Sequence, residues 1–148
     1  MRTVLFVAFA AALSALSTGA AFADELTPAI VDPAVAIQTS LAKDSMASVQ
    51  ANAATIEEQA GKLGAPAAKI AEAAKELKAT TKIADARAAF GKLSEAIVQY
   101  IDVHKLTLDP RIRVAMCPMV NKPWLQRDGP IQNPYYGTEM PTCGSFKK

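Results

Sequence analysis

The sequence predicts an all-α fold: an up-and-down bundle of three to four helices, with an irregular, proline-rich C-terminal segment packed on it. From residue 24 to about residue 104 the chain is rich in alanine, lysine and glutamate, which favour helices, and glycine occurs only three times. Apolar and small residues recur there in steps of three and four, the period of a helix with one buried face. Six of the nine prolines then fall within the last 39 residues, where they exclude long helices.

The N-terminus has the pattern of an export signal. Arg2 precedes an apolar run over residues 3–13, and small residues follow, ending in Ala21-Phe22-Ala23. This pattern predicts a secretory signal peptide over residues 1–23, cleaved before Asp24. The apolar run is too short and too rich in small residues for a membrane span. We therefore expect a periplasmic or secreted protein with no membrane span after cleavage.

Three helices are expected in the first part of the exported chain. Asp32-Pro33 is typical of a helix start, and the apolar stripe that follows predicts a helix over about residues 33–60, ended by Gly61. A second helix is expected over residues 65–81 and a third over residues 83–104. The first is twice as long as the second, so we expect either a break in it, giving four helices, or a C-terminal segment laid against it. Short connections favour antiparallel neighbours.

The composition changes at Asp109-Pro110. We expect residues 24–108 to form the helical bundle and residues 109–148 to form a sulfur-rich segment of the same domain. Residues 112–116 alternate between apolar and polar and are compatible with a short strand. The segment also holds most of the aromatic residues of the exported chain, which predicts an ordered tail, with Trp124 as its anchor.

Charge and composition exclude several classes of function. The net charge of +2 is too small for a protein that binds nucleic acid by neutralising phosphates. There is no glycine-rich phosphate loop, and one histidine excludes a multi-histidine metal site. No Cys-x-x-Cys occurs and no nucleophile has an evident base, so we expect no enzymatic activity. The mixed charges of the outer helix faces, Arg87 among them, are typical of a solvated surface.

The C-terminal segment gathers sulfur. The spacings Cys-x-Met and Met-x-x-Cys let two short pieces each aim two sulfurs at one point, which gives four candidate soft ligands: Cys117, Met119, Met140 and Cys143. Thiolate and thioether together favour Cu(I), with silver as a further candidate; zinc is the second choice because it gains little from methionine. His104, in phase with the buried face of its helix, is an additional candidate ligand or a cation at the helix end.

A different interpretation of the same residues stays open. In an oxidising compartment Cys117 and Cys143 can form a disulfide that closes a loop of about 27 residues and stabilises the fold by about 3–4 kcal/mol. The methionines would then be ordinary core residues that fill gaps.

The C-terminal motif resembles a domain of exported bacterial proteins that stands alone behind a signal peptide or is fused to periplasmic adaptor subunits of copper/silver efflux pumps. The resemblance covers about residues 33–146 and rests on an ordered series of matches: Ala86-Arg87-x-x-Phe90, Cys117-Pro118-Met119, Trp124-Leu125, Asn133-Pro134-Tyr135-Tyr136-Gly137, Met140 and Cys143-Gly144. It implies a helical bundle with a heavy-metal-associated sulfur site, carried by Cys117, Met119, Met140 and Cys143.

Together these observations lead us to expect an exported, monomeric Cu(I)-binding protein, a metallochaperone in heavy-metal resistance. It would buffer the metal or hand it to a periplasmic metal-efflux component through cysteine and methionine ligands. The alternative is a metal-free, disulfide-stapled helical interaction module of the cell envelope. The redox state of the two cysteines discriminates between them.

Overall fold

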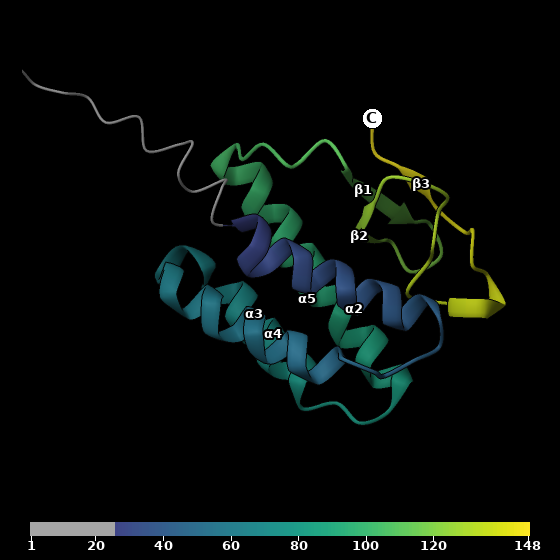
Figure 1. Cartoon of the computed structure of the whole chain (residues 1–148), viewed down its shortest axis with the longest axis horizontal. Helices are drawn as coiled ribbons and strands as arrows, with labels where there is room; N and C mark the ends of the chain where they lie inside the picture. Colours follow the sequence, from purple (N-terminus) through teal and green to yellow (C-terminus); the bar gives the residue numbers. More distant parts are fainter. Residues whose placement is uncertain (1–25) are drawn as a thin grey trace, which may run out of the picture.

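The structure is a computed structural model that describes residues 26–148 (Figure 1). The predicted signal peptide, residues 1–23, lies outside the described residues. In chain order the main elements are α2 (Asp32–Ala42), α3 (Val49–Leu63), α4 (Ala68–Lys78), α5 (Ile83–His104), β1 (Ile112–Cys117), β2 (Lys122–Arg127) and β3 (Ser145–Phe146). A π-helical turn, Thr27–Val31, leads into α2, and 3-10 turns occur at Ala65–Ala67 and Gly137–Glu139.

The predicted all-α class is wrong, because the C-terminal segment forms a three-stranded antiparallel sheet. The strand order is β2-β1-β3, so β1 lies in the centre and pairs on both sides. Only β1 was expected as a strand. The prolines suggested irregular structure, yet Pro123 lies inside β2, an edge strand, where a residue without an N–H group is tolerated. The protein is therefore mixed α/β, with helices dominant.

The helix expected over residues 33–60 is broken into two, which was one of the two expected arrangements. Residues 43–48 separate α2 from α3, and Asp44 and Ser48 both have left-handed backbone angles, which turns the chain back. The other expectation is met as well, because the C-terminal segment packs on α2 through β2 and the turn at Gly137–Glu139. The third helix, α5, has the predicted bounds.

The core lies between the helices and beneath the sheet. α3, α4 and α5 pack against one another in sequence order, α2 packs on α3, and β2 covers α5 and α2 (Figure 1). Trp124 from β2 is fully buried and meets Tyr135 edge-on, with 6.0 Å between ring centroids. Phe90 from α5 also packs near Tyr135, with 5.9 Å between ring centroids. Trp124 therefore anchors the C-terminal segment, as predicted.

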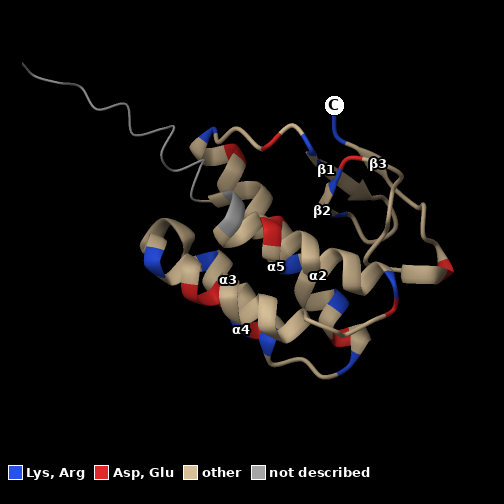
Figure 2. Ribbon diagram, in the orientation of Figure 1, with Lys and Arg blue, Asp and Glu red and all other residues tan. Residues whose placement is uncertain are grey.

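Charged residues of both signs alternate over the outer faces of the helices (Figure 2). They form exposed ion pairs such as Lys62–Glu58 at 2.7 Å and Lys92–Glu76 at 2.6 Å. Pairs of this kind contribute at most about 1 kcal/mol each. Among residues 26–148, no helix is both long enough and apolar enough to cross a membrane.

Candidate functional site

The pairing of β1 with β3 brings the two cysteines together. Ala115 is opposite Phe146 and Met116 is opposite Ser145, so the next position along β1, Cys117, falls beside Gly144 and Cys143. Cys117 is fully buried, Cys143 is half-buried, and both thiols are free. Two residues separated by 26 positions in the sequence thus become neighbours across the sheet.

Gly144 allows this approach. Its φ is +148°, and a Cβ atom at this position would lie 2.6 Å from Cη2 of Trp124 and 3.1 Å from the carbonyl oxygen of Met116. Any larger residue would therefore push β3 away from β1 and from the indole ring. The glycine keeps Cys143 in place next to Cys117.

Asn133 ties the thiol pair to the rest of the segment. Its side chain is fully buried, and its Nδ2 donates to Sγ of Cys117 at 3.3 Å and to the carbonyl oxygen of Cys143 at 2.6 Å. Its Oδ1 accepts from the backbone N–H groups of Tyr135 at 2.7 Å and Tyr136 at 3.2 Å. Asn133 therefore holds the Cys117 side chain and the Cys143 backbone close together.

The environment of the Cys143 thiol includes the Cys117 side chain. Burial raises the pKa of the Cys143 thiol above its ordinary value, and the negative charge of Cys117 and a hydrogen bond between the two side chains raise it further. A negative charge on Cys117 therefore makes it harder to remove the proton of the Cys143 thiol. A cation held between the sulfurs would relieve this repulsion.

The methionines are placed differently from one another. Met140 is half-buried and starts the turn that carries Cys143, whose N–H donates to the Met140 carbonyl oxygen at 3.2 Å. Met119 lies in the turn between β1 and β2, two residues after Cys117, and is 63% exposed. Met140 is thus next to the thiol pair along the chain, whereas the Met119 side chain faces solvent.

Among the described residues, His104 forms no three-residue ligand group with Cys117 and Cys143. It ends α5, is exposed rather than turned toward the bundle, and stacks on Tyr100 at 4.3 Å between ring centroids. It lines a small pocket with Ala65 and Pro66, at the connection between α3 and α4. Gly91, where an added Cβ atom would lie 3.5 Å from the Tyr135 ring of the C-terminal segment, is 13 residues earlier, or about 20 Å along the helix. The apolar period of α5 predicted that His104 lies on the buried face, but the packed part of this helix ends one turn earlier.

Arg87 is a residue that sequence reasoning missed. Instead of facing solvent, its guanidinium donates from Nε to the Pro134 carbonyl oxygen at 2.9 Å, and from Nη2 to the Leu41 carbonyl oxygen at 3.0 Å and to Asp44 Oδ1 at 2.5 Å. Asp44 also accepts hydrogen bonds from the backbone and hydroxyl of Thr138. This group, which we call the Arg87 latch, joins α5, the α2–α3 connection and the C-terminal segment.

Gly137 leaves space for the side chains of the Arg87 latch. A Cβ atom there would lie 2.0 Å from Asp44 Oδ1 and 2.2 Å from Arg87 Nη2, and φ is +54°. The available sequence signal was the set of small residues at 84, 88 and 91 on the same helix face, over which a long side chain can lie.

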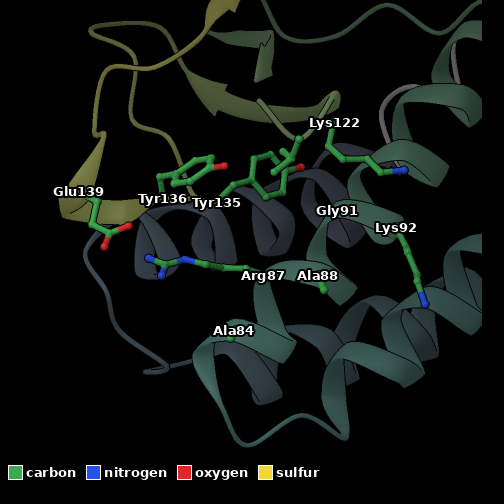
Figure 3. A pocket seen from close by; sticks show the side chains of 10 residues that line it. Ala84, Arg87, Ala88, Gly91, Lys92, Lys122, Tyr135, Tyr136 and Glu139 are labelled. Carbon is green, nitrogen blue, oxygen red and sulfur yellow. The ribbon is translucent and has the colours of Figure 1, made fainter. Parts of the chain in front are cut away.

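A cavity of about 570 Å³ lies between α5 and the C-terminal segment (Figure 3). Ala88 and Gly91 contribute from α5, Tyr135 and Tyr136 contribute from the opposite side, and Arg87 extends from α5 toward the segment that carries Tyr136 (Figure 3). Burial raises the pKa of the Tyr135 hydroxyl, which donates to the Pro123 carbonyl oxygen. No cysteine or methionine of the described chain lines this cavity, so it is separate from the thiol pair.

Within residues 26–148 no group of three or more His, Cys, Asp and Glu side chains is placed to hold a metal ion. The sulfur donors are therefore two thiols, with thioethers as the available additions. No family model, curated protein or solved structure matches the chain significantly.

Proposed function

We propose that this protein binds one Cu(I) ion between the thiolates of Cys117 and Cys143, and that it buffers the metal or hands it to an efflux component of the cell envelope. The observation that carries the proposal is that the buried Asn133 amide nitrogen donates both to the Cys117 sulfur at 3.3 Å and to the Cys143 carbonyl oxygen at 2.6 Å, at the point where β1 pairs with β3. The resemblance of the motif to an efflux-associated domain supports the choice of metal and partner.

The donor set suits Cu(I) better than zinc. Cu(I) is soft, prefers sulfur and accepts two or three ligands, so two thiolates and the thioether of Met140 suffice. Structural zinc takes four ligands from cysteine, histidine and carboxylate, and the described residues bring only two such side chains together here. Silver shares the softness of Cu(I) and is expected at the same site.

The two thiolates together favour a bound cation. Two thiolates at close range repel each other, and one positive charge between them offsets that repulsion. Cys117 is fully buried, which keeps water and oxygen from one side of the ion, whereas the half-buried Cys143 leaves a side from which the metal can leave. Transfer then proceeds by exchange of one sulfur ligand at a time.

The test is an anaerobic titration of the reduced protein with Cu(I) in competition with a coloured chelator. We expect one equivalent to be retained, and Cys117→Ser or Cys143→Ser to lose it to the chelator. Met140→Leu should weaken binding about tenfold, the equivalent of about 1.4 kcal/mol. Met46→Leu is the matched control, because Met46 packs beside the core of the helical part.

If the reduced protein holds no Cu(I) at any chelator concentration, the copper proposal is wrong. The interaction module with a Cys117–Cys143 staple would then be favoured, with the cavity beside α5 as the place to look for its partner. If the Met140 variant binds as tightly as the native protein, the site is formed by the two thiolates alone.

A further inference from the structure

We propose that Cys117 and Cys143 are a reversible redox pair: exchange with a disulfide oxidant converts them into an intramolecular disulfide, which closes the metal site. The redox chemistry stands on the geometry of the sheet, and its consequence for the metal rests on the proposed function. The dithiol and disulfide forms would thus be two states of one protein.

The two cysteines lie close enough for a disulfide to be inferred from the contacts of one shared neighbour. Adjacent strands lie about 4.7–4.9 Å apart, and disulfides bridge Cα atoms about 4.4–6.8 Å apart. Continuing the register of β1 with β3 by one residue places Cys117, the last residue of β1, opposite Gly144, and Cys143 is the residue before this glycine. A single atom, Asn133 Nδ2, contacts both the Cys117 sulfur and the Cys143 carbonyl oxygen. Gly144 keeps the two strands together at this point.

The unequal burial of the thiols sets the order of the reaction. Cys143 is half-buried and meets the oxidant first, whereas Cys117 has no exposed surface. The Cys143 thiolate attacks one sulfur of the oxidant disulfide, forming a mixed disulfide and releasing the other sulfur as a thiolate. The Cys117 thiolate then attacks the Cys143 sulfur, and the second oxidant sulfur leaves. The two protein thiols are oxidised, the oxidant is reduced to two thiols, and both protons pass to the leaving sulfurs.

The two states exclude one another. A disulfide leaves no thiolate for the metal, and a bound metal occupies both sulfur atoms that the oxidant would need. The fold should survive oxidation, because Asn133 keeps its bonds to the Cys143 carbonyl oxygen and to the backbone of Tyr135 and Tyr136. Oxidation in the envelope would therefore release the metal without unfolding the protein.

The test is incubation of the reduced protein with glutathione buffers of graded potential, followed by alkylation of free thiols and mass spectrometry. We expect a single transition from two alkylated thiols to none, with a mass lower by two hydrogens and no bound glutathione. In Cys117→Ser a glutathione adduct should accumulate on Cys143. In Cys143→Ser the adduct on the buried Cys117 should form at least about tenfold more slowly.

A stable glutathione adduct or a linked dimer of the native protein, in place of the internal disulfide, would overturn the proposal. Equal rates of adduct formation in the two single variants would overturn the proposed order of attack, in which Cys143 reacts first. Cu(I) competition on the same samples separates the two proposals. A disulfide that forms in a protein unable to bind Cu(I) leaves the redox pair intact and rejects the copper function, and copper binding without disulfide formation does the reverse.

Discussion

Asn133 links the thiol pair to the backbone of the C-terminal segment through both ends of its side-chain amide. The amide donates on the cysteine side and accepts on the tyrosine side, and no buried side-chain polar atom of the described residues lacks a partner. Nothing in the sequence distinguishes this asparagine from one that shapes a turn. Its role follows from burial, because a fully buried amide must find its partners within the protein.

We predict that Asn133→Ala destabilises the protein by about 2–4 kcal/mol, since it leaves the N–H groups of Tyr135 and Tyr136 without their acceptor. Equilibrium unfolding in urea measures the change. Asn52→Ala is the control, because Asn52 makes a single exposed bond to the Ser48 carbonyl oxygen in α3. A loss no larger than that of the control would show that the amide does not hold the segment.

The Arg87 latch makes stability depend on pH through Asp44. Hydrogen bonds from Thr138 first, and then from Arg87, hold the pKa of the Asp44 carboxyl below its ordinary value of 3.8. A carboxyl whose pKa is lower in the folded than in the unfolded state stabilises the fold at every pH above its unfolded pKa. This stabilisation is lost as the pH falls through the folded pKa.

We therefore predict that Asp44→Asn is less stable than the native protein at pH 6, and that the difference shrinks as the pH falls below 3.8. Comparing urea midpoints of both proteins across this range isolates Asp44 from other acids, such as Asp109, whose pKa Arg111 lowers to about 2. A gap that is constant with pH would exclude the latch as its cause.

At the scale of elements, the helices were predictable and the sheet was not. The apolar period of a helix and the glycines that end it are local signals, and from them the predicted bounds of α4 and α5 come close to the observed ones. The pairing of β1 with β3 joins residues about 30 positions apart, and β3 has only two residues, too few for a periodic signal. β2 contains a proline and a buried glutamine, Gln126, which accepts from the Trp124 indole at 3.0 Å. The alternation of apolar and polar residues does not reveal such a strand, because its polar residue is buried and satisfied by a specific hydrogen bond.

The contact of β3 with β1 depends on Gly144. We predict that Gly144→Ala destabilises the protein by about 1–3 kcal/mol, because the added methyl group meets the Trp124 ring and the backbone is strained. The variant should also let a thiol reagent reach Cys117 faster, as β3 moves away. Gly61→Ala is the control: nothing lies within 4 Å of its added Cβ in α3, and it should be neutral or stabilising. An unchanged rate of Cys117 labelling would contradict this account of β3.

At the scale of the whole molecule, the C-terminal segment holds the helices together. The Gln38 side chain of α2 donates to the Gln132 carbonyl oxygen at 2.7 Å, and the Arg87 latch joins α5 to the same segment. The four sulfurs were identifiable by type and spacing, but which of them meet depends on these long-range contacts. The segment that carries the cysteines is also the one that closes the helical layer, so site and bundle should unfold as one unit.

This coupling predicts that Cu(I) stabilises the helices as well as the tail. A ligand that binds only the folded state adds about 4 kcal/mol at a free concentration a thousand times its Kd, and in a cooperative unit the whole molecule gains it. Thermal unfolding followed by the helical circular dichroism signal should therefore shift to higher temperature with Cu(I). The shift should vanish in Cys117→Ser, where one of the two thiolate ligands is missing. A shift in the tryptophan fluorescence of Trp124 without one in the helical signal would instead mean that the tail and the bundle unfold separately.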